Sequence, residues 1–335
     1  MARPRIAVVT GAAGFLGRAF RAALRARGWD VRGVDVRPGP DVTVGDVSRA
    51  GAWSGVLDGA SLVVHAAAVV TEGGDPATFW RVNVDGTRTV LDEAARAGVG
   101  RVLHLSATVV HGRDFPDGVD ETGAVRMTGN PYTDTKVAAE HQVLLAAAAG
   151  RVGTTVVRLG EVYGPHGGTW TVRPVELMRR GLFVLIDGGR GVLSPTYVDD
   201  AVDGGLAAAL SDDGLGEVFH VTGGQGVPAV DYFGRYAAML GVRLRSLPAA
   251  AAAAMSGPLG MVSRAVGWHP PLSPRTVEYV THRGTYSIAK AAHVLDWTPR
   301  VSLDDGMVRT QEWLRDAGLV PEPAADAGTG DAEAR

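Results

Sequence analysis

The stretch VVTGAAGFLG, residues 8 to 17, decides the fold. A short apolar run leads into glycines at positions 11, 14 and 17, and a segment with helical spacing of apolar residues follows. Glycine permits a tight turn and lets a pyrophosphate approach the backbone, where free amides at a helix N-terminus favour negative charge. Ala12 stands where the usual dinucleotide fingerprint has a glycine, and the Gly-Lys-Ser/Thr ending of an ATP-type loop is absent. The stretch predicts a strand, a dinucleotide-binding turn and a helix, with a glycine-rich turn that binds nothing as the alternative.

Outward from this turn, apolar runs alternate with helical segments through the first half of the chain. The runs show no polar alternation, as expected for strands of a parallel sheet that is covered on both faces. They are RIAVVT, DVRGVDV, SLVVHAAA, RVLHLSA and GTTVVRLG, and the helical segments span 15–28, 76–98 and 132–150. Repeated β-α units imply right-handed crossovers. The pattern predicts an α/β fold with a doubly wound parallel sheet of the Rossmann type.

Beyond about residue 164 the pattern loosens into shorter elements with clusters of proline and glycine. We therefore predict a dinucleotide-binding Rossmann domain over 1–165, to which 192–224 return. A smaller, discontinuous C-terminal substrate lobe is predicted over 166–191 and 225–321. The last residues, 322–335, have almost no apolar content and predict a disordered tail.

Composition argues against several classes of partner. The 335 residues include 33 basic and 36 acidic ones, interspersed, with a net charge of -3, so nothing favours binding to nucleic acid or to an anionic membrane surface. No segment approaches the roughly 20 apolar residues that span a bilayer. The chain has no cysteine, which fits a reducing cytoplasm, and its nine histidines lack metal-ligand spacing. We expect a cytoplasmic protein that binds a small molecule and has no metal, nucleic-acid or membrane partner.

Asp35 ends the second predicted strand, 18 residues after Gly17. A carboxylate at this place can hydrogen-bond the ribose of an adenine dinucleotide, and it repels a 2′-phosphate. NAD is therefore the expected cofactor and NADP the less favoured one, although Arg37 lies nearby. The alternative is that Asp35 is an ordinary residue at the end of a strand and binds no ligand.

The segment NPYTDTKVAAEHQVLL, residues 130–145, places Tyr132 and Lys136 one helical turn apart, so both lie on one face. By itself this spacing more often marks two ordinary residues of a solvated helix than a catalytic pair. The rest of the chain decides between these interpretations.

A series of short motifs, in one order, resembles those of a known family. They are TGAAGFLG, GDV with Asp46, HAAA at 65–68, NVDGT with Asn83, SATVVHG, PYTDTK, RLGEVYGP, YVDDAVDG and YSIAKAAHVLDWTPRVSLDDGM. The family is the extended short-chain dehydrogenases/reductases, also called the NAD-dependent epimerase/dehydratase family. The resemblance covers roughly residues 4–318 and is nearest to the branch of 3β-hydroxysteroid dehydrogenases and dihydroflavonol reductases.

The resemblance implies that Tyr132 is the general acid/base, and that Lys136 stabilises its phenolate and holds the nicotinamide ribose. Such help is needed because a phenol with an ordinary pKa of about 10 is a poor base near neutrality. The residues expected to contact the cofactor are Gly11, Gly14, Phe15, Leu16, Gly17, Asp35, Asp46, Val47, His65, Ala66, Ala67, Asn83 and Lys136.

The family's substrate-polarising hydroxyl falls on Ala107 when the loop is counted back from Gly112. Either Thr108 or Ser106 supplies the hydroxyl through a shifted loop, or the role is missing. His111 replaces the family's usual tyrosine, and we interpret it as part of the loop structure rather than as a catalyst.

Three functions remain open. The favoured one is an NAD(P)-dependent oxidoreductase that transfers a hydride between nicotinamide and a secondary alcohol or ketone of a mainly apolar small molecule. The second is a nucleotide-sugar epimerase or dehydratase with recycled NAD, and the third is a non-catalytic dinucleotide sensor, which would generally lack the Tyr-Lys pair.

Two positions argue against the nucleotide-sugar function. Members of that kind usually place an asparagine where this chain has Glu161 and an arginine where it has Leu193, and both serve a substrate diphosphate. A glutamate there would repel the diphosphate. The resemblance also implies a homodimer, through helices at 76–97 and 132–149.

Overall fold

The computed structural model describes residues 5–70, 74–255 and 274–322. Its centre is a sheet of seven strands in the order β11-β6-β5-β4-β1-β2-β3, and every neighbouring pair is parallel. The strands are β1 (Ile6–Thr10), β2 (Asp30–Asp35), β3 (Val42–Val44), β4 (Leu62–His65), β5 (Arg101–Ala107), β6 (Gly153–Leu159) and β11 (Val218–Val221). The predicted doubly wound sheet is confirmed. Its order reverses between β1 and β4, which is where sheets of this kind bind dinucleotides.

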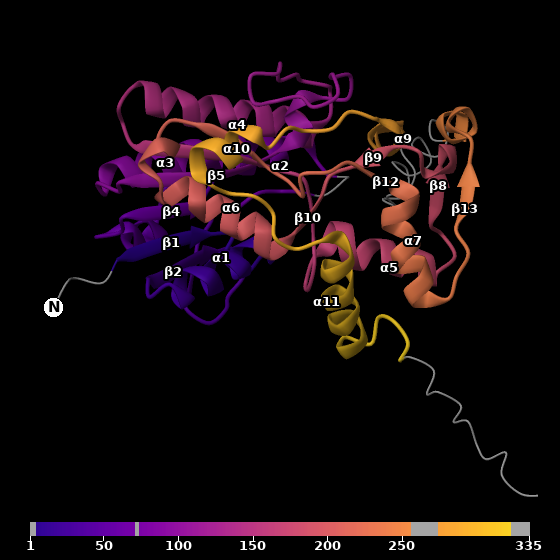
Figure 1. The fold of residues 1–335 in the computed structure, drawn as a ribbon. Coiled ribbons are helices and arrows are strands. Elements are labelled where there is room, and N and C mark those ends of the chain that lie inside the picture. The colour runs from indigo at the N-terminus through magenta and orange to yellow at the C-terminus, as the bar shows by residue number, and fades with distance from the viewer. Residues whose placement is uncertain (1–4, 71–73, 256–273, 323–335) are drawn as a thin grey trace, which may run out of the picture.

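Helices cover both faces of the sheet (Figure 1). α1 (Phe15–Ala26) and α6 (Val198–Leu210) pack on one face, and α3 (Gly86–Arg96) and α4 (Pro131–Ala148) pack on the other. Alternate strand residues enter the two cores: Ala7 and Val9 lie on the α1 side, and Val8 lies on the α3 side. Because both faces are buried, the strands are continuous apolar runs in the sequence.

On the α3 and α4 side, strand residues change from valine to polar side chains toward the carboxyl ends. Val63 of β4 is followed by His65, and Val156 of β6 is followed by Arg158. The buried side chains gathered here, which we call the polar layer, are His65, His104, Ser106 and Arg158 from the strands and Lys136 and Glu140 from α4. The fold thus places charged and titratable groups beneath α4 at one end of the sheet.

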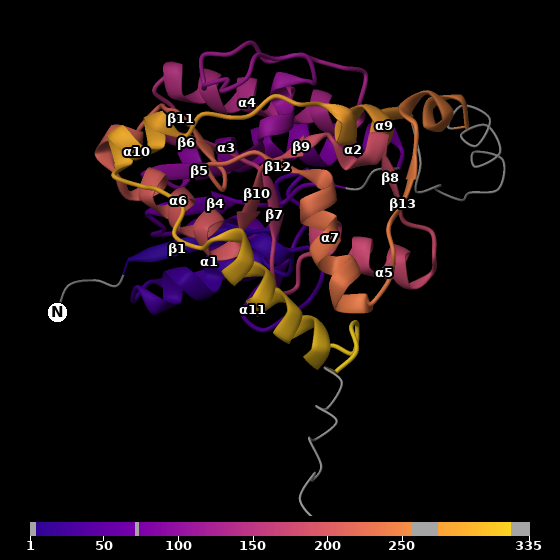
Figure 2. The same ribbon diagram turned by 45° about the vertical axis from the view of Figure 1, so that its right-hand side comes forward.

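A second lobe lies beyond that end of the sheet (Figures 1 and 2). It contains three two-stranded pairs, which are β7 (Glu161–Tyr163) with β10 (Pro195–Tyr197), β9 (Val192–Leu193) with β12 (Val227–Pro228), and β8 (Val184–Ile186) with β13 (Arg245–Leu247). Its helices include α5 (Arg173–Arg179), α7 (Ala229–Leu240), α9 (Pro274–Thr281) and α11 (Leu303–Asp316). Tyr163, Tyr232 and Tyr236 are fully buried in its core.

Two later segments of the chain return to the sheet. α6 packs against β5, β6 and β11, and α10 (Ala289–Leu295) packs against β11 and α6. Asp200 in the first turn of α6 is buried, and its carboxylate accepts hydrogen bonds from the backbone amides of Arg300 and Val301 at 2.9 and 3.0 Å. This contact holds the segment before α11 against the Rossmann domain. Residues 323–335 of the predicted tail and residues 256–273 of the predicted substrate lobe lie outside the described residues.

Gly17→Ala should destabilise the fold, because a Cβ atom on Gly17 would lie 2.0 Å from the carbonyl oxygen of Gly11. We expect the free energy of unfolding in urea to fall by about 1–3 kcal/mol. Gly234→Ala is the matched control, since a Cβ atom at this position of α7 meets nothing within 4 Å. There alanine should raise the free energy of unfolding by roughly 0.5–1 kcal/mol. Equal stability of the two variants would contradict the expectation.

Candidate active site

The turn after β1 depends on glycine, because it lies close against the loop that follows β4. Gly11 has a φ of +65°, and a Cβ atom there would lie 2.7 Å from the amide nitrogen of Ala67 and 2.8 Å from the carbonyl carbon of Ala66. Gly14 is the N-cap of α1 and provides no side-chain cap, and the first turn of α1 contains no acidic residue. Amides at such a helix end are available to an anion. The first turn of α1 therefore has the amide donors that the pyrophosphate of a dinucleotide requires.

Asp35 is held against this turn at the end of β2. One carboxylate oxygen accepts the amide of Ala13 at 2.9 Å, and the other accepts the amide of Arg37 at 2.9 Å. The side chain of Asp35 is only 5% exposed, whereas that of Arg37 is 64% exposed. The carboxylate thus lies fixed beside the glycine turn, as a ribose-binding role requires.

Asp46 and Val47 follow β3 and face different surroundings. The carboxylate of Asp46 accepts the amide of Ser48 at 2.9 Å and the guanidinium of Arg81 at 3.1 Å. Val47 is buried in the core under α3. A cofactor contact by Val47 would therefore come from its backbone.

His65 joins three elements through its ring. Its Nδ1 lies 2.7 Å from the hydroxyl of Thr10, and its Nε2 lies 3.0 Å from the hydroxyl of Thr87. Burial, with a smaller contribution from the charge of Lys136, lowers the pKa of His65 to about 3, so the ring is neutral. The ring is a structural bridge, and the backbone of Ala66 and Ala67 that follows it lies against Gly11, with the amide of Ala67 3.3 Å from the hydroxyl of Thr10.

Asn83 lies in a π-helical turn, Trp80–Asp85, just before α3. Its carboxamide accepts from the amide of Val69 at 2.7 Å, donates to the carbonyl of Val69 at 3.1 Å, and donates to the hydroxyl of Thr135 at 3.0 Å. Asn83 therefore fastens the loop after β4 to α4.

Phe15 and Leu16 open α1 and are partly buried. Both side chains pack against the core of the second lobe, and Leu16 also contacts the core of the sheet. Because the side chains join the two lobes, their contribution to a cofactor site would come from backbone amides.

Tyr132 and Lys136 occupy the first turns of α4, which begins where the side chain of Asn130 accepts the amide of Tyr132. The ammonium of Lys136 donates to the carbonyl of Leu105 at 2.8 Å and lies 5.9 Å from the centre of the Tyr132 ring. Burial lowers the pKa of Lys136 to about 8, although the charge of Glu140 opposes this effect. Burial raises the pKa of Tyr132 to about 12. The pair predicted from the sequence is thus brought together in a desolvated place.

The structure separates the two candidate hydroxyls. Ser106 is buried in the polar layer and donates its hydroxyl to Glu140. Thr108 is buried at the start of a 3-10 turn and shares a hydrogen bond with Tyr286, which arrives from the C-terminal part of the chain. Ala107 lies between them. His111 is fully buried, 2.9 Å from His220, which agrees with a structural role in the loop.

Glu140 and Arg158 form a buried ion pair that the sequence analysis missed. The guanidinium of Arg158 donates from Nη2 to Glu140 at 2.8 Å and from Nε at 3.1 Å, and the two side chains are 5% and 3% exposed. The signal that would have revealed Glu140 is its spacing, since it follows Lys136 by one further turn on the same face of α4.

Glu161 is also buried, with 1% of its surface exposed. One carboxylate oxygen accepts the backbone amide of Ser194 at 2.5 Å, and the other accepts the hydroxyl of Tyr279 from α9. Leu193 is buried in the core of the second lobe. Tyr279 was not identified from the sequence, because no local pattern links it to Glu161.

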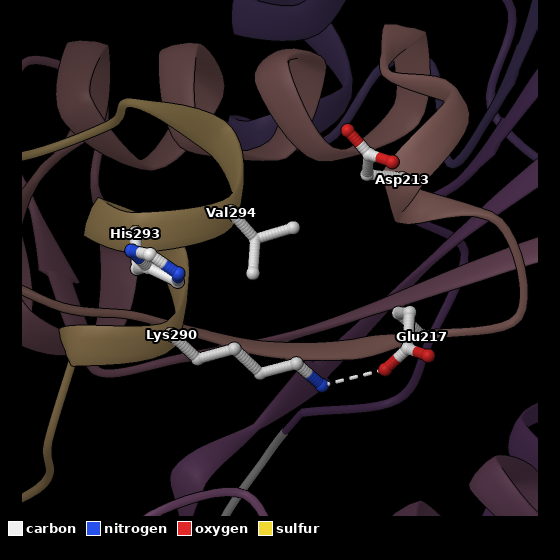
Figure 3. A pocket seen from close by; sticks show the side chains of 5 residues that line it. All are labelled: Asp213, Glu217, Lys290, His293 and Val294. Carbon is white, nitrogen blue, oxygen red and sulfur yellow. Dashed lines mark hydrogen bonds and ion pairs between the residues drawn. The ribbon is translucent and has the colours of Figure 1, made fainter.

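A surface cavity of about 480 Å³ lies elsewhere (Figure 3). It is lined by Asp213, Glu217, Lys290, His293 and Val294, and Lys290 pairs with Glu217 at 2.7 Å. Glu217 precedes β11, so this cavity lies at the amino end of that strand, away from the carboxyl ends that carry Tyr132 and the glycine turn. Across the described ranges, no group of three or more histidine or acidic side chains is arranged to hold a metal ion, and no helix is long and apolar enough to cross a membrane.

Glu140→Gln should strongly destabilise the protein, because it leaves the guanidinium of Arg158 buried without a counter-charge. We expect a loss of about 3–5 kcal/mol in the free energy of unfolding, measured in urea. Asp92→Asn is the matched control: it breaks an ion pair with Arg151 in which both side chains are more than a third exposed, and should cost less than about 1 kcal/mol. Similar losses in both variants would show that burial of the pair is unimportant.

The comparisons with known proteins agree on one family. Residues 7–222 match the model of the NAD dependent epimerase/dehydratase family. The chain is 28% identical over 321 residues to the bovine sterol-4-alpha-carboxylate 3-dehydrogenase, decarboxylating, covering 90% of each protein. It is 29% identical to a 3 beta-hydroxysteroid dehydrogenase/Delta 5-->4-isomerase of Mycobacterium tuberculosis, covering 87% of this chain and 85% of that protein. It is 33% identical over 64% of its length to a 4-hydroxy-2-methyl-3-oxo-4-farnesyl-3,4-dihydroquinoline-1-oxide ketoreductase of Stigmatella aurantiaca, covering 67% of that protein.

Solved structures agree with this result. MoeE5 in complex with UDP-glucose and NAD is 26% identical, with a TM-score of 0.75 over 93% of this chain and 99% of MoeE5. The glycine turn, the fixed Asp35 and the Tyr132-Lys136 pair fit the cofactor that this neighbour contains. The chain belongs to the NAD dependent epimerase/dehydratase family, in its extended short-chain dehydrogenase/reductase branch, and is an NAD-dependent oxidoreductase.

Proposed function

We propose that this protein interconverts a secondary alcohol and a ketone on a mainly apolar small molecule. The observation that carries the proposal is the buried carboxylate of Glu161 at the place where diphosphate-binding relatives have an asparagine. A diphosphate against it would meet negative charge in desolvated surroundings. Leu193, at the place of their arginine, lies in an apolar core and offers no compensating cation.

The names of similar proteins support this substrate class. The bovine relative is named for a sterol carboxylate, the mycobacterial relative for a steroid, and the Stigmatella relative as a ketoreductase of a farnesyl quinoline. These substrates share fused rings and large apolar surfaces. An apolar carbinol or ketone is therefore the expected substrate here.

Tyr132 is proposed to be the general acid/base, and Lys136 its electrostatic partner. With a pKa near 12, Tyr132 needs a nearby positive charge to lose its proton close to neutrality. Lys136, with a pKa near 8, is mostly protonated at neutral pH and lies close to the Tyr132 ring. Tyr132 would take the hydroxyl proton during oxidation and return it during reduction.

NAD, when bound, supplies the nicotinamide that accepts or donates the hydride. We propose that the backbone of Gly11, Gly14, Phe15, Leu16 and Gly17 holds its pyrophosphate and that Asp35 holds the adenosine ribose. Asp46, Val47, His65, Ala66, Ala67 and Asn83 would line the remaining length of the cofactor, and Lys136 would hold the nicotinamide ribose.

We assign the substrate-polarising hydroxyl to Thr108 rather than to Ser106. The hydroxyl of Ser106 donates its only proton to Glu140 inside the polar layer, so it has no proton to donate to a substrate oxygen. Thr108 instead pairs with the hydroxyl of Tyr286 at the carboxyl end of the sheet. Because Tyr286 has a proton of its own and can donate instead of accept, the proton of Thr108 can turn to a substrate oxygen.

A second candidate is a nucleotide-sugar epimerase or dehydratase, which uses the same Tyr-Lys pair and recycles NAD. The observation in its favour is the likeness to MoeE5 in complex with UDP-glucose and NAD. The placement of Glu161 argues against it.

Tyr132→Phe should abolish turnover. Purified protein with NAD would be mixed in turn with hydroxysteroids, aryl carbinols and UDP- or dTDP-sugars, and absorbance of reduced nicotinamide would be followed. We expect net reduction with an apolar carbinol, and a rate at least about 100-fold lower in Tyr132→Phe with cofactor binding retained. Tyr163→Phe, in the second-lobe core, is the control. An altered sugar nucleotide without net reduced cofactor would favour the second candidate.

We also propose a homodimer formed through α2 (Pro76–Phe79), α3 and α4. Two large apolar side chains on or between these helices are exposed: Leu145 on α4 at 64%, and Trp80 in the turn between α2 and α3 at 42%. Burying such side chains would favour association. Sedimentation at micromolar concentration should give a dimer, and Leu145→Asp should shift it toward monomer. A monomer in the unmodified protein would refute the proposal.

A further inference from the structure

Two buried histidines contact each other beside the turn that carries Thr108. His111 is the last residue of the 3-10 turn Thr108–His111, and His220 lies on β11. Both residues are fully buried, their Nε2 atoms lie 2.9 Å apart, and their rings meet edge to face. The pair therefore joins the turn to a strand of the main sheet.

The contacts of His111 determine which of its ring nitrogens carries the proton. Nδ1 lies 3.2 Å from the carbonyl oxygen of Ala124, an acceptor, so Nδ1 carries the proton. Nε2 lies 3.3 Å from Nη1 of Arg158, and a guanidinium can only donate. His111 thus presents the lone pair of Nε2 to its neighbours.

His220 has two acceptors to serve. Its Nε2 faces the lone pair of His111, and its Nδ1 lies 3.1 Å from the carbonyl oxygen of Ser287. Burial, with a smaller contribution from the charges of His111 and Arg158, lowers the pKa of His220 to about 3, so the ring has one proton near neutrality. That proton is favoured on Nε2, because opposed lone pairs would otherwise lie 2.9 Å apart there, closer than at Ser287.

The donor in this contact is fixed from the sheet. His220 lies beside Arg158 of β6 in the parallel ladder, and its backbone amide donates to the carboxylate of Glu121 at 2.6 Å. Arg158 in turn is held by its buried pairing with Glu140. The ring of Tyr286 lies against both histidines, with centroids 6.1 Å from His111 and 5.7 Å from His220. A rigid strand thus holds the end of a short turn.

We propose that His220 is a positioning residue, which donates Nε2–H to His111 and thereby holds the turn Thr108–His111 where the Thr108 hydroxyl meets the substrate oxygen. The inference rests on the proposed function and deepens it, because it names a residue that acts on the reaction through Thr108. His220 itself touches neither substrate nor cofactor.

Two substitutions at His220 separate its two contacts. The amide nitrogen of glutamine can take the place of Nε2, and that of asparagine can take the place of Nδ1. His220→Gln therefore keeps a donor toward His111, and kcat should stay within about threefold of the unmodified protein. His220→Asn keeps only the contact with Ser287, and kcat should fall roughly tenfold or more with KM within about twofold.

A double-mutant cycle shows whether the effect passes through Thr108. Rates would be measured with NAD and the hydroxysteroid or aryl carbinol that the full-length protein oxidises fastest. In a Thr108→Val background, which lacks the hydroxyl, His220→Asn should lower kcat no further. A merely structural loss would lower kcat equally in both backgrounds.

Two controls accompany the cycle. His293→Gln changes an exposed histidine of α10 and should leave kcat unchanged. Thermal unfolding identifies any variant that has lost its fold. Nitrogen NMR of 15N-histidine-labelled protein at pH 7, assigned with His111→Gln and His220→Gln, should show the proton on Nδ1 of His111 and on Nε2 of His220.

The outcomes are distinguishable. A proton on Nδ1 of His220, full activity of His220→Asn, or an equal loss in the Thr108→Val background overturns this proposal and leaves the proposed function intact. Binding of NAD with no oxidation of any carbinol defeats the proposed function, and this inference with it.

Discussion

The buried pairing of Glu140 with Arg158 is the interaction on which the arrangement of the site depends. Tyr132, Lys136 and Glu140 occupy successive turns of one helical face, so whatever fixes Glu140 also fixes the two residues before it. Two ions in an apolar interior are tolerable only as a well-made pair. Sliding α4 by one turn would separate Glu140 from the guanidinium on β6, and the desolvation cost would then oppose the shift. The polar layer therefore determines the register of the helix that carries the Tyr-Lys pair.

Much of this architecture could be predicted because it is encoded locally. The apolar runs, the glycine turn and the Tyr132-Lys136 spacing each lie within one strand-turn-helix unit, where periodicity and glycine placement are informative. The contact of Tyr279 with Glu161 joins residues 118 apart, and no pattern in the sequence reports it. Nor could the sequence decide between Ser106 and Thr108, since which of them contacts Glu140 depends on where β5 ends relative to α4. The strands of the second lobe have two or three residues each, too few for a recognisable period.

The two lobes differ in the chemical groups that they could present to a ligand. On the Rossmann side the residues nearest the glycine turn offer backbone amides, because the side chains of Phe15, Leu16 and His65 are committed to packing or bridging. On the other side the groups are phenols, indole and one carboxylate. The NAD that solved neighbours contain suits the first kind of surface. The substrates named for the relatives differ, which suits the second kind, whose side chains can change without disturbing the sheet.

The contact of Asp200 with the amides of Arg300 and Val301 has a mechanical consequence. The chain crosses between the lobes repeatedly, through the connections before α6, after β11, before α10 and before α11, and Asp200 ties the last of these crossings to the Rossmann domain. Several connections, one of them tied to the sheet by Asp200, restrain a swing of one lobe against the other about a single hinge. We therefore expect admission and release of substrate to depend on rearrangement of individual loops and side chains, and the slow step of the cycle to be sensitive to those segments.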